Sequence, residues 1–362
     1  MALLYRQELA ELGLGAGPIP MAEATARSVP FPLPTVAFAN LLDRDGGIGR
    51  WSETMVSPEM LLRYPIERRN ACADWYLETL PLDTSANPWT AVALDAESGL
   101  IVTDKYHRVS KGGATEVEPL IPGVDVTAAF RRSAEELWLS GSAGRLFRSI
   151  GGELTEFEPS PVGSAPGEMD GSPSDQDLEI YVRHPDGTIA RFDGEVWSTY
   201  PGEPTGLGSL SWVAAGEVIA VGKDDEAVRR IRDGVTTFEA VGDGSVGLSA
   251  SANIPGLGLI VADVFGSLYQ HADGRWGRFA KPGAWMIRAL CPTGSGLVAG
   301  GSFGWLVAYS PEGGFCDLPT GPSSVRKIVP VGDTFLVAWE NQQWVPEPGG
   351  PRTFYSWIRH AP

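Results

Sequence analysis

Positively charged side chains are scarce in this sequence. Its 362 residues include 28 lysines and arginines against 45 aspartates and glutamates, so the formal net charge is −17. Nucleic-acid binding depends on clustered cations that neutralise phosphates, and no basic run occurs here. The composition therefore argues against a nucleic-acid partner. An acidic chain is better suited to a basic partner or a neutral small molecule.

Cysteines and long apolar runs are scarce as well. The three cysteines, Cys72, Cys291 and Cys316, are too few and too scattered for a disulfide framework or a CxxC metal site, which fits a reducing compartment. No apolar run approaches the length of a membrane span. Glu8 and Glu11 interrupt the segment that would form the apolar core of a signal peptide. We therefore expect a cytoplasmic protein with no membrane partner.

Glycine and proline, in contrast, are abundant, with 45 and 29 residues, which implies many turns. A chain of this length suggests two domains unless it is one repeat array. Seven eight-residue stretches align without a gap, at intervals of 37 to 43 residues. They begin at Val102, Leu139, Val182, Val221, Val261, Ala299 and Ala338. In each stretch an apolar strand end leads through a small or polar turn to an aliphatic residue, which predicts a β-hairpin.

Each hairpin lies within a longer unit. An apolar or small-residue segment precedes it and predicts an inner strand, which is weakest in the third unit because residues 163–176 are rich in Gly, Ser, Pro and Asp. A glycine turn and a polar strand follow it, as in TEVEP and TEFEP. A polar strand that ends in proline suits an exposed outer edge. Four short strands per unit of about 40 residues are typical of a β-propeller blade.

The chain resembles the seven-bladed β-propellers grouped with WD-repeat, kelch and two-component-regulator-like bacterial propellers. The stretch DGTIARFDGEVW, from Asp186 to Trp197, is similar to blades of the regulator-like group, whereas the Trp-Asp dipeptides of WD repeats are absent. The resemblance implies an all-β fold, a seven-bladed β-propeller of four-stranded blades over residues 86–362. A propeller fold by itself does not imply an activity.

Residues 1–85 stand outside the repeat and predict a partly helical N-terminal extension. We expect helices at Leu3–Leu12, from Ser57 onward and at Ile66–Leu80, and a hairpin of Thr35–Leu42 with Gly49–Val56. We interpret the extension as a cap on the propeller, or alternatively as a lid or a dimerisation element. The ring is closed either by Thr353–Ile358 alone or together with an N-terminal strand such as Thr35–Leu42.

Two short motifs are similar to catalytic ones. Gly300–Gly304 matches the GxSxG nucleophile elbow, and Gly242–Gly247 matches GxGxxG. The first occupies a hairpin turn rather than a strand-to-helix turn, and the second leads into an expected strand rather than a helix. No two of the four histidines are spaced as metal ligands on one element. We therefore expect no catalytic residue, no metal and no cofactor.

Polar and aromatic residues gather at the third to fifth positions of the hairpin repeat. In a propeller these turns surround one mouth of the central channel, so they predict a binding rim. The expected rim residues are Asp104, Lys105, His184, Asp186, Lys223, Asp224, Asp225, Asp263, Phe265, Phe303, Glu340 and Asn341. In the alternative interpretation, residues such as Asp186 and Asp224 are there because they form good turns in water.

Arg288 and Arg326 are conspicuous charges on expected inner strands, which should otherwise be apolar or small. They predict channel residues of one of two kinds. An arginine paired with a carboxylate such as that of Asp170 would be structural. An unpaired arginine in the channel would be a candidate for binding an anion.

These features favour a non-catalytic interaction protein that binds a basic protein partner, which it neutralises or scaffolds. The alternative is a small-molecule enzyme, a hydrolase or lyase, with its site at the mouth of the channel. Such a site would draw on His184, on Arg288 or Arg326, and on the carboxylates of Asp104, Asp263 and Glu340 for acid–base chemistry or metal coordination.

Overall fold

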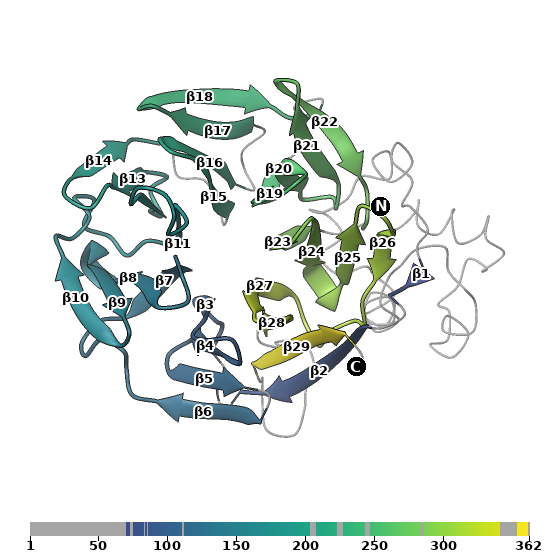
Figure 1. Cartoon of the computed structure of the whole chain (residues 1–362), viewed down its shortest axis with the longest axis horizontal. Helices are drawn as coiled ribbons and strands as arrows, with labels where there is room; N and C mark the ends of the chain where they lie inside the picture. Colours follow the sequence, from purple (N-terminus) through teal and green to yellow (C-terminus); the bar gives the residue numbers. More distant parts are fainter. Residues whose placement is uncertain are drawn as a thin grey trace, which may run out of the picture.

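The structure is a computed structural model that describes residues 70–360 except 73–74, 83, 85, 111, 203–207, 223–226, 243–246, 284–285 and 341–352. Its strands form seven sheets arranged as blades around a central opening, each with four antiparallel strands, and one sheet carries an additional parallel strand (Figure 1). The predicted all-β, seven-bladed propeller is confirmed. The helices of the described residues are two short 3₁₀ turns, η1 (Ser142–Gly144) and η2 (Ser302–Gly304).

The first four blades follow one another along the chain, and each starts at the channel and ends at the outside. Blade 1 contains β3 (Thr90–Ala93), β4 (Ser98–Val102), β5 (Tyr106–Ser110) and β6 (Gly113–Val117). Blade 2 contains β7 (Val126–Arg131), β8 (Glu136–Gly141), β9 (Leu146–Ile150) and β10 (Glu153–Phe157). Blade 3 contains β11 (Glu168–Gly171), β12 (Ile180–Arg183), β13 (Ile189–Phe192) and β14 (Trp197–Tyr200). Blade 4 contains β15 (Gly208–Ala214), β16 (Glu217–Gly222), β17 (Ala227–Arg232) and β18 (Val235–Ala240).

The last three blades include the two that receive strands from the N-terminal part of the chain. Blade 5 contains β19 (Leu248–Ile254), β20 (Gly258–Asp263), β21 (Leu268–Ala272) and β22 (Arg275–Ala280). Blade 6 contains β23 (Ile287–Thr293), β24 (Gly296–Gly301), β25 (Leu306–Ser310) and β26 (Gly314–Asp317), and β1 (Asn70–Ala71) is added outside β26. Blade 7 contains β27 (Val325–Val331), β28 (Thr334–Trp339), β29 (Phe354–His360) and β2 (Trp75–Pro81).

The burial of the strands depends on their position within the blade. Second strands lie between neighbouring blades, and every residue of β4, β8, β16 and β24 is buried. Outer strands face water, and on β18 the side chain of Phe238 is 71% exposed. The weak inner strand expected in the third unit is β11, which has four residues. The predicted order of strands within a blade is therefore confirmed in blades 1 to 6.

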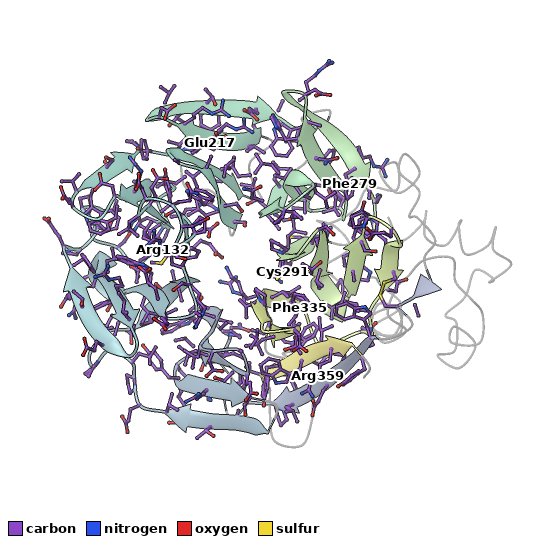
Figure 2. The ribbon with its side chains drawn as sticks, viewed as in Figure 1. Arg132, Glu217, Phe279, Cys291, Phe335 and Arg359 are labelled. Carbon is purple, nitrogen blue, oxygen red and sulfur yellow. A yellow bond between two sulfur atoms is a disulfide. The ribbon has the colours of Figure 1, made fainter. Side chains whose placement is uncertain are left out.

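The hydrophobic core is divided among the blades. Buried apolar side chains form seven clusters, one between each pair of neighbouring blades. The cluster between blades 6 and 7 includes Cys291 and Phe335, both labelled in Figure 2. The cluster between blades 7 and 1 includes Leu336 and Ile101, which closes the ring with the same kind of packing. Burial of apolar surface between blades is the main force that holds such a repeat fold together.

The ring is closed by a strand from the N-terminal part of the chain. β2 pairs antiparallel with β29 over seven positions, from Trp75 opposite His360 to Pro81 opposite Phe354, and the two lie side by side in Figure 1. The helix expected at Ile66–Leu80 is therefore wrong at Trp75–Leu80, and also at Asn70–Ala71, which form strand β1. The free edge of β29 and the packing of Trp75 and Leu77 on the core between blades 6 and 7 favour a strand instead. Residues 75–81 thus belong to the ring, although its start was expected at residue 86.

The seventh copy of the repeat was also misaligned. The hairpin expected from Ala338 predicts that the third strand of blade 7 begins near Val345. In the structure the second strand, β28, ends at Trp339 and the third strand, β29, begins at Phe354. The segment Thr353–Ile358, considered as the strand that completes the blade alone, is thus part of the third strand. A closing N-terminal strand was the correct alternative, although the segment suggested for it, Thr35–Leu42, lies outside the described residues.

A second contact fastens the N-terminal segment to the ring. β1 pairs parallel with β26, with Asn70 opposite Cys316, and the backbone N–H of Cys72 donates to the carbonyl of Asp317 at 2.9 Å. The thiols of Cys72 and Cys316 are joined in a disulfide. A single bond is no framework, but it removes the argument for a reducing compartment, because disulfides persist in oxidising ones. The spacing of 244 residues hid the pair from sequence reasoning.

The remaining expectations for the first 85 residues are not addressed by these strands. The helices at Leu3–Leu12 and from Ser57, and the hairpin of Thr35–Leu42 with Gly49–Val56, lie outside the described residues. A cap, lid or dimerisation element therefore stays a prediction. Among the described residues, no helix is long and apolar enough to span a membrane.

Candidate functional site

One face of the ring collects the turns that were predicted to form a rim. The turn between the second and third strands of each blade lies at the same end as the start of the inner strand, because these strands are antiparallel: Ile287 at the start of β23 pairs with Gly301 at the end of β24. The segments between blades reach the same end. We call this the upper face, and the opposite side, with the turns between first and second strands, the lower face.

The rim residues of blade 1 are engaged within the fold. The Asp104 carboxylate accepts hydrogen bonds from the hydroxyls of Thr84 at 2.8 Å and Thr103 at 3.0 Å. These bonds, that of Thr84 first, lower the pKa of Asp104, so it is charged at neutral pH. Lys105 forms an ion pair with Glu116 on β6 at 2.7 Å. Asp104 remains exposed and presents its charge to solvent.

His184, in contrast, is not a surface residue. It is 2% exposed, and its ring nitrogens contact the hydroxyls of Ser160 at 2.9 Å and Ser164 at 3.0 Å. Burial lowers its pKa, which favours the neutral ring. The two serines lie in the segment between blades 2 and 3, so His184 fastens that segment to the turn that follows β12. Nearby, the exposed Asp186 accepts from the backbone N–H of Thr188 at 2.9 Å, as a turn former does.

The rim residues of blades 5 and 6 are also part of the turn structure. Asp263 is 2% exposed and accepts from the backbone N–H groups of Phe265 and Ser267, both at 2.8 Å. Its burial raises its pKa. Phe265 and Phe303 are half-buried. Phe303 has a φ of 62°, within the 3₁₀ turn η2.

The GxSxG match lies in this same turn. Ser302 is 4% exposed, and its backbone N–H donates to the carbonyl of Met286 at 3.0 Å. At Gly304, which has a φ of 76°, a Cβ atom would lie 2.1 Å from the carbonyl oxygen of Gly321. Glycine is therefore required by the close approach of two chain segments. The GxGxxG match likewise leads into strand β19 rather than a helix.

The channel arginines occupy β-bulges. Four inner strands carry an extra residue immediately after their first one, and each extra residue is polar. These residues are Thr127, Ser249, Arg288 and Arg326. A bulge re-aims the side chain of the inserted residue, which explains why charges are accepted on strands that are otherwise apolar or small. Both arginines thus lie where the channel opens onto the upper face.

The two arginines differ in their partners. Arg288 donates to both carboxylate oxygens of Glu340, at 2.5 and 2.8 Å. Glu340, a predicted rim residue of blade 7, is thereby tied to blade 6. Arg326 donates from Nε to the carbonyl of Pro88 at 3.3 Å. Asp170, the carboxylate suggested as an arginine partner, accepts instead from the backbone N–H groups of Trp212 at 2.8 Å and Gly171 at 2.9 Å.

A second ion pair crosses the channel and was not predicted. Lys327 on β27 contacts Glu168 on β11 at 2.9 Å. Their blades, 7 and 3, are not neighbours in the ring, so the pair links opposite walls of the channel (Figure 1). The position of Lys327 beside Arg326 was the available signal. Glu168 gave none, because it lies in residues 163–176, where the inner strand was expected to be weakest.

The remaining rim predictions, Lys223, Asp224, Asp225 and Asn341, lie outside the described residues. Among the described residues, no group of three or more His, Cys, Asp or Glu side chains is arranged to hold a metal ion. The arrangement of the upper face is suited to recognition by charge and hydrogen bonding. The exposed carboxylates and the half-buried phenylalanines are the side chains that a ligand on this face would meet.

No protein-family model matches the chain, and no curated protein matches it significantly. Its fold is similar to many solved structures. Ycf48 bound to a D1 peptide has a TM-score of 0.59 at 15% identity, covering 82% of this chain and 98% of its own. A catalytically inactive virginiamycin B lyase from Staphylococcus aureus with quinupristin has a TM-score of 0.61 at 16% identity, covering 79% and 99%. The WD40 repeats of RRP9 have a TM-score of 0.60 at 13% identity, covering 81% and 99%. At such identities the likeness shows the fold alone.

Proposed function

We propose that this chain is a non-catalytic propeller that binds a basic protein partner on its upper face. One observation carries the proposal, an acidic sector over blades 1 to 3. Its five exposed carboxylates are those of Asp104, Glu118, Asp125, Glu158 and Asp186. None of them forms an ion pair with another described residue. The two cations among these turns are each neutralised by an outer strand, Lys105 by Glu116 and Arg145 by Glu156.

The surplus of negative charge favours association with a basic surface. Clustered charges of one sign steer an oppositely charged partner and raise its association rate at low ionic strength. Such a protein could neutralise or scaffold its partner. Known propellers of similar fold include one solved with a bound peptide, which supports a binding role without assigning a partner.

The candidate acid–base residues are held by the fold, which supports a binding role over a catalytic one. His184 and Asp263, on which an acid–base mechanism would draw, are both 2% exposed. His184 is hydrogen-bonded to the segment between blades 2 and 3, and Asp263 is hydrogen-bonded within its own turn. Glu340 is held by Arg288. A general acid or base must reach the reacting group, and these three side chains are oriented by the fold instead.

The test is a charge reversal in the acidic sector. We expect Asp125→Lys together with Asp186→Lys to reduce the association rate with the partner about tenfold at low salt and to flatten its salt dependence. The control reverses two exposed carboxylates of the lower face, Glu97→Lys and Glu135→Lys, at equal change of net charge. Partners are enriched from lysate with each protein and their association is followed by surface kinetics. Equal rates for both double variants would contradict the proposal.

The expected cytoplasmic location stays a prediction, and the Cys72–Cys316 bond gives its test. Thiols are alkylated in intact cells before the protein is denatured, and the labelled cysteines are identified by mass spectrometry. A cytoplasmic protein is expected to label at Cys72 and Cys316. Protection of both, with the disulfide recovered, would place the working protein in an oxidising environment.

A further inference from the structure

Arg326 is a cation at the channel mouth, and no carboxylate of the described residues pairs with it. Its Nε donates to the carbonyl of Pro88 at 3.3 Å, which ties it to the segment before blade 1. In the part of the chain that the structure describes, its two terminal nitrogens have no hydrogen-bond or ion-pair partner. The residue is half-buried, at the bulge that starts β27. The fork of a guanidinium group is built to hold a planar anion with two bonds.

The neighbouring cations have their partners already. Arg288 is held by Glu340 and Lys327 by Glu168. Burial lowers the pKa of Arg288, and the positive charge of Arg326 acts in the same direction against the attraction of Glu340. The two guanidinium groups therefore lie near enough to repel each other, and Glu340 forms its ion pair with Arg288. An additional anion at Arg326 would neutralise its charge and so reduce the repulsion between Arg326 and Arg288.

We propose that the channel mouth between blades 6, 7 and 1 binds a carboxylate group, which Arg326 holds through its terminal nitrogens. A singly charged, planar carboxylate matches one guanidinium fork. A phosphate dianion is less suited, because it would bring a second negative charge toward Glu340 and Glu168. Trp89, which follows the carbonyl that holds Arg326, is 39% exposed and offers apolar surface for the rest of the ligand.

This inference does not depend on a basic protein partner. The acidic sector lies over blades 1 to 3, whereas the arginines belong to β23 and β27. The carboxylate could be that of a free small acid or of an acidic side chain in a polypeptide. Both sources share the same chemistry, so the experiment includes one probe for each.

The experiment is saturation-transfer NMR on the full chain with propionate, and with the peptide acetyl-Gly-Asp-Gly-amide against its Asn counterpart. We expect transfer to propionate, to the Asp peptide, or to both, and the responding probe identifies the source. Arg326→Gln should weaken that binding at least tenfold. Arg326→Lys keeps the charge but loses the fork, so intermediate binding is expected. Arg145→Gln, which removes a half-buried arginine of blade 2 that is paired with Glu156, should leave binding unchanged.

Folding of each variant is checked by its thermal midpoint, and Arg326→Lys serves as the test variant if Arg326→Gln does not fold. Equal transfer for wild type and the Arg326 variants would overturn the proposal. Binding of inorganic phosphate more tightly than propionate would overturn the assignment to carboxylates.

Discussion

Asp170 carries a charge that its surroundings tolerate poorly. Burial raises the pKa of its carboxyl group to about 6, partly offset by hydrogen bonds from the backbone of Trp212 and Gly171 and by the charge of Lys327. The folded state therefore binds this proton more tightly than the unfolded chain does. At pH 7 Asp170 is mostly ionised, and burying that charge lowers the stability of the folded state relative to the unfolded chain, so acidification from pH 7 toward pH 5 should stabilise the fold through this group.

The prediction concerns the pH dependence of stability. When the pH is lowered from 7 to 5, protonation of Asp170 should increase the free energy of unfolding by about 1 kcal/mol. Asp170→Asn cannot titrate, so its gain over this range should be smaller by that amount, whatever its absolute stability. Urea unfolding at both pH values measures the difference. Parallel pH profiles for the two proteins would show that Asp170 titrates normally.

Single residues were the hardest level to predict from sequence. The turn interpretation of Asp186 agrees with its bond to Thr188. The burial of His184 was not visible, because its partners Ser160 and Ser164 come from the preceding interblade segment. Nor could the sequence separate the paired Arg288 from Arg326, since the difference depends on Glu340, 52 residues away from Arg288.

Neighbouring blades are joined by buried polar contacts as well as by apolar cores. Glu179, 4% exposed, accepts from Arg191 of its own blade 3 at 2.5 Å. It also accepts from the indole of Trp212 at 3.2 Å and from the backbone N–H of Gly216 at 2.9 Å, both in blade 4. One carboxylate thus satisfies three donors at the lower end of the boundary between two blades.

Removing this carboxylate should be costly. Glu179→Ala leaves the Arg191 charge and the Gly216 N–H without their partner, and we expect a loss of about 3 to 5 kcal/mol in the free energy of unfolding. Glu195→Gln, at an exposed turn of the same blade, is the control and should change stability by less than about 0.5 kcal/mol. Chemical denaturation compares them. A loss below about 1 kcal/mol for Glu179→Ala would show that water replaces the contacts.

The N-terminal segment makes two contacts with different roles. Deletion of residues 1–74 removes β1 and the disulfide but keeps β2, so a folded ring is expected. Deletion of residues 1–81 also removes β2, leaves the edge of β29 unpaired and should abolish cooperative unfolding. Circular dichroism melts distinguish the outcomes. A cooperative melt for the longer deletion would show that three strands suffice for blade 7.

The disulfide can be tested without any deletion. Cys72 and Cys316 are 244 residues apart, and cross-links over long loops typically stabilise by about 2 to 5 kcal/mol. Cys72→Ser with Cys316→Ser should therefore lower the melting temperature, and a reductant should lower that of the wild type to the same value. The double variant itself should be insensitive to reductant. An unchanged melting temperature in the variant would mean that β2 alone holds the segment.

Most elements were predictable because they repeat. In blades 1 to 6 the hairpin, the glycine turn and the polar outer strand recur, and each copy supports the interpretation of the others. β2 had no such support, because it lies before the first copy and its local spacing of Trp75, Tyr76 and Leu80 also suits a helix. In blade 7 the insertion before Phe354 displaced the third strand from the repeat.

The whole molecule combines two opposite charges on one face. Five exposed carboxylates lie over blades 1 to 3 of a chain with a net charge of −17. The channel mouth at blades 6 and 7 holds Arg288 and Lys327, which are paired with Glu340 and Glu168, and Arg326, which has no carboxylate partner among the described residues. The composition of the sequence indicated the surplus of negative charge, but it did not indicate the cations at the channel mouth. A ligand that covers both would need a basic surface together with a carboxylate, which a neutral small molecule lacks.

The most direct test of protein binding is native mass spectrometry of the full chain purified gently from its own host. We predict a stoichiometric complex with one additional basic protein, which dissociates as the ammonium acetate concentration is raised because salt screens the acidic sector. A bare chain at every concentration, or a chain carrying only a small-molecule adduct, would contradict the proposal that the upper face binds a protein partner.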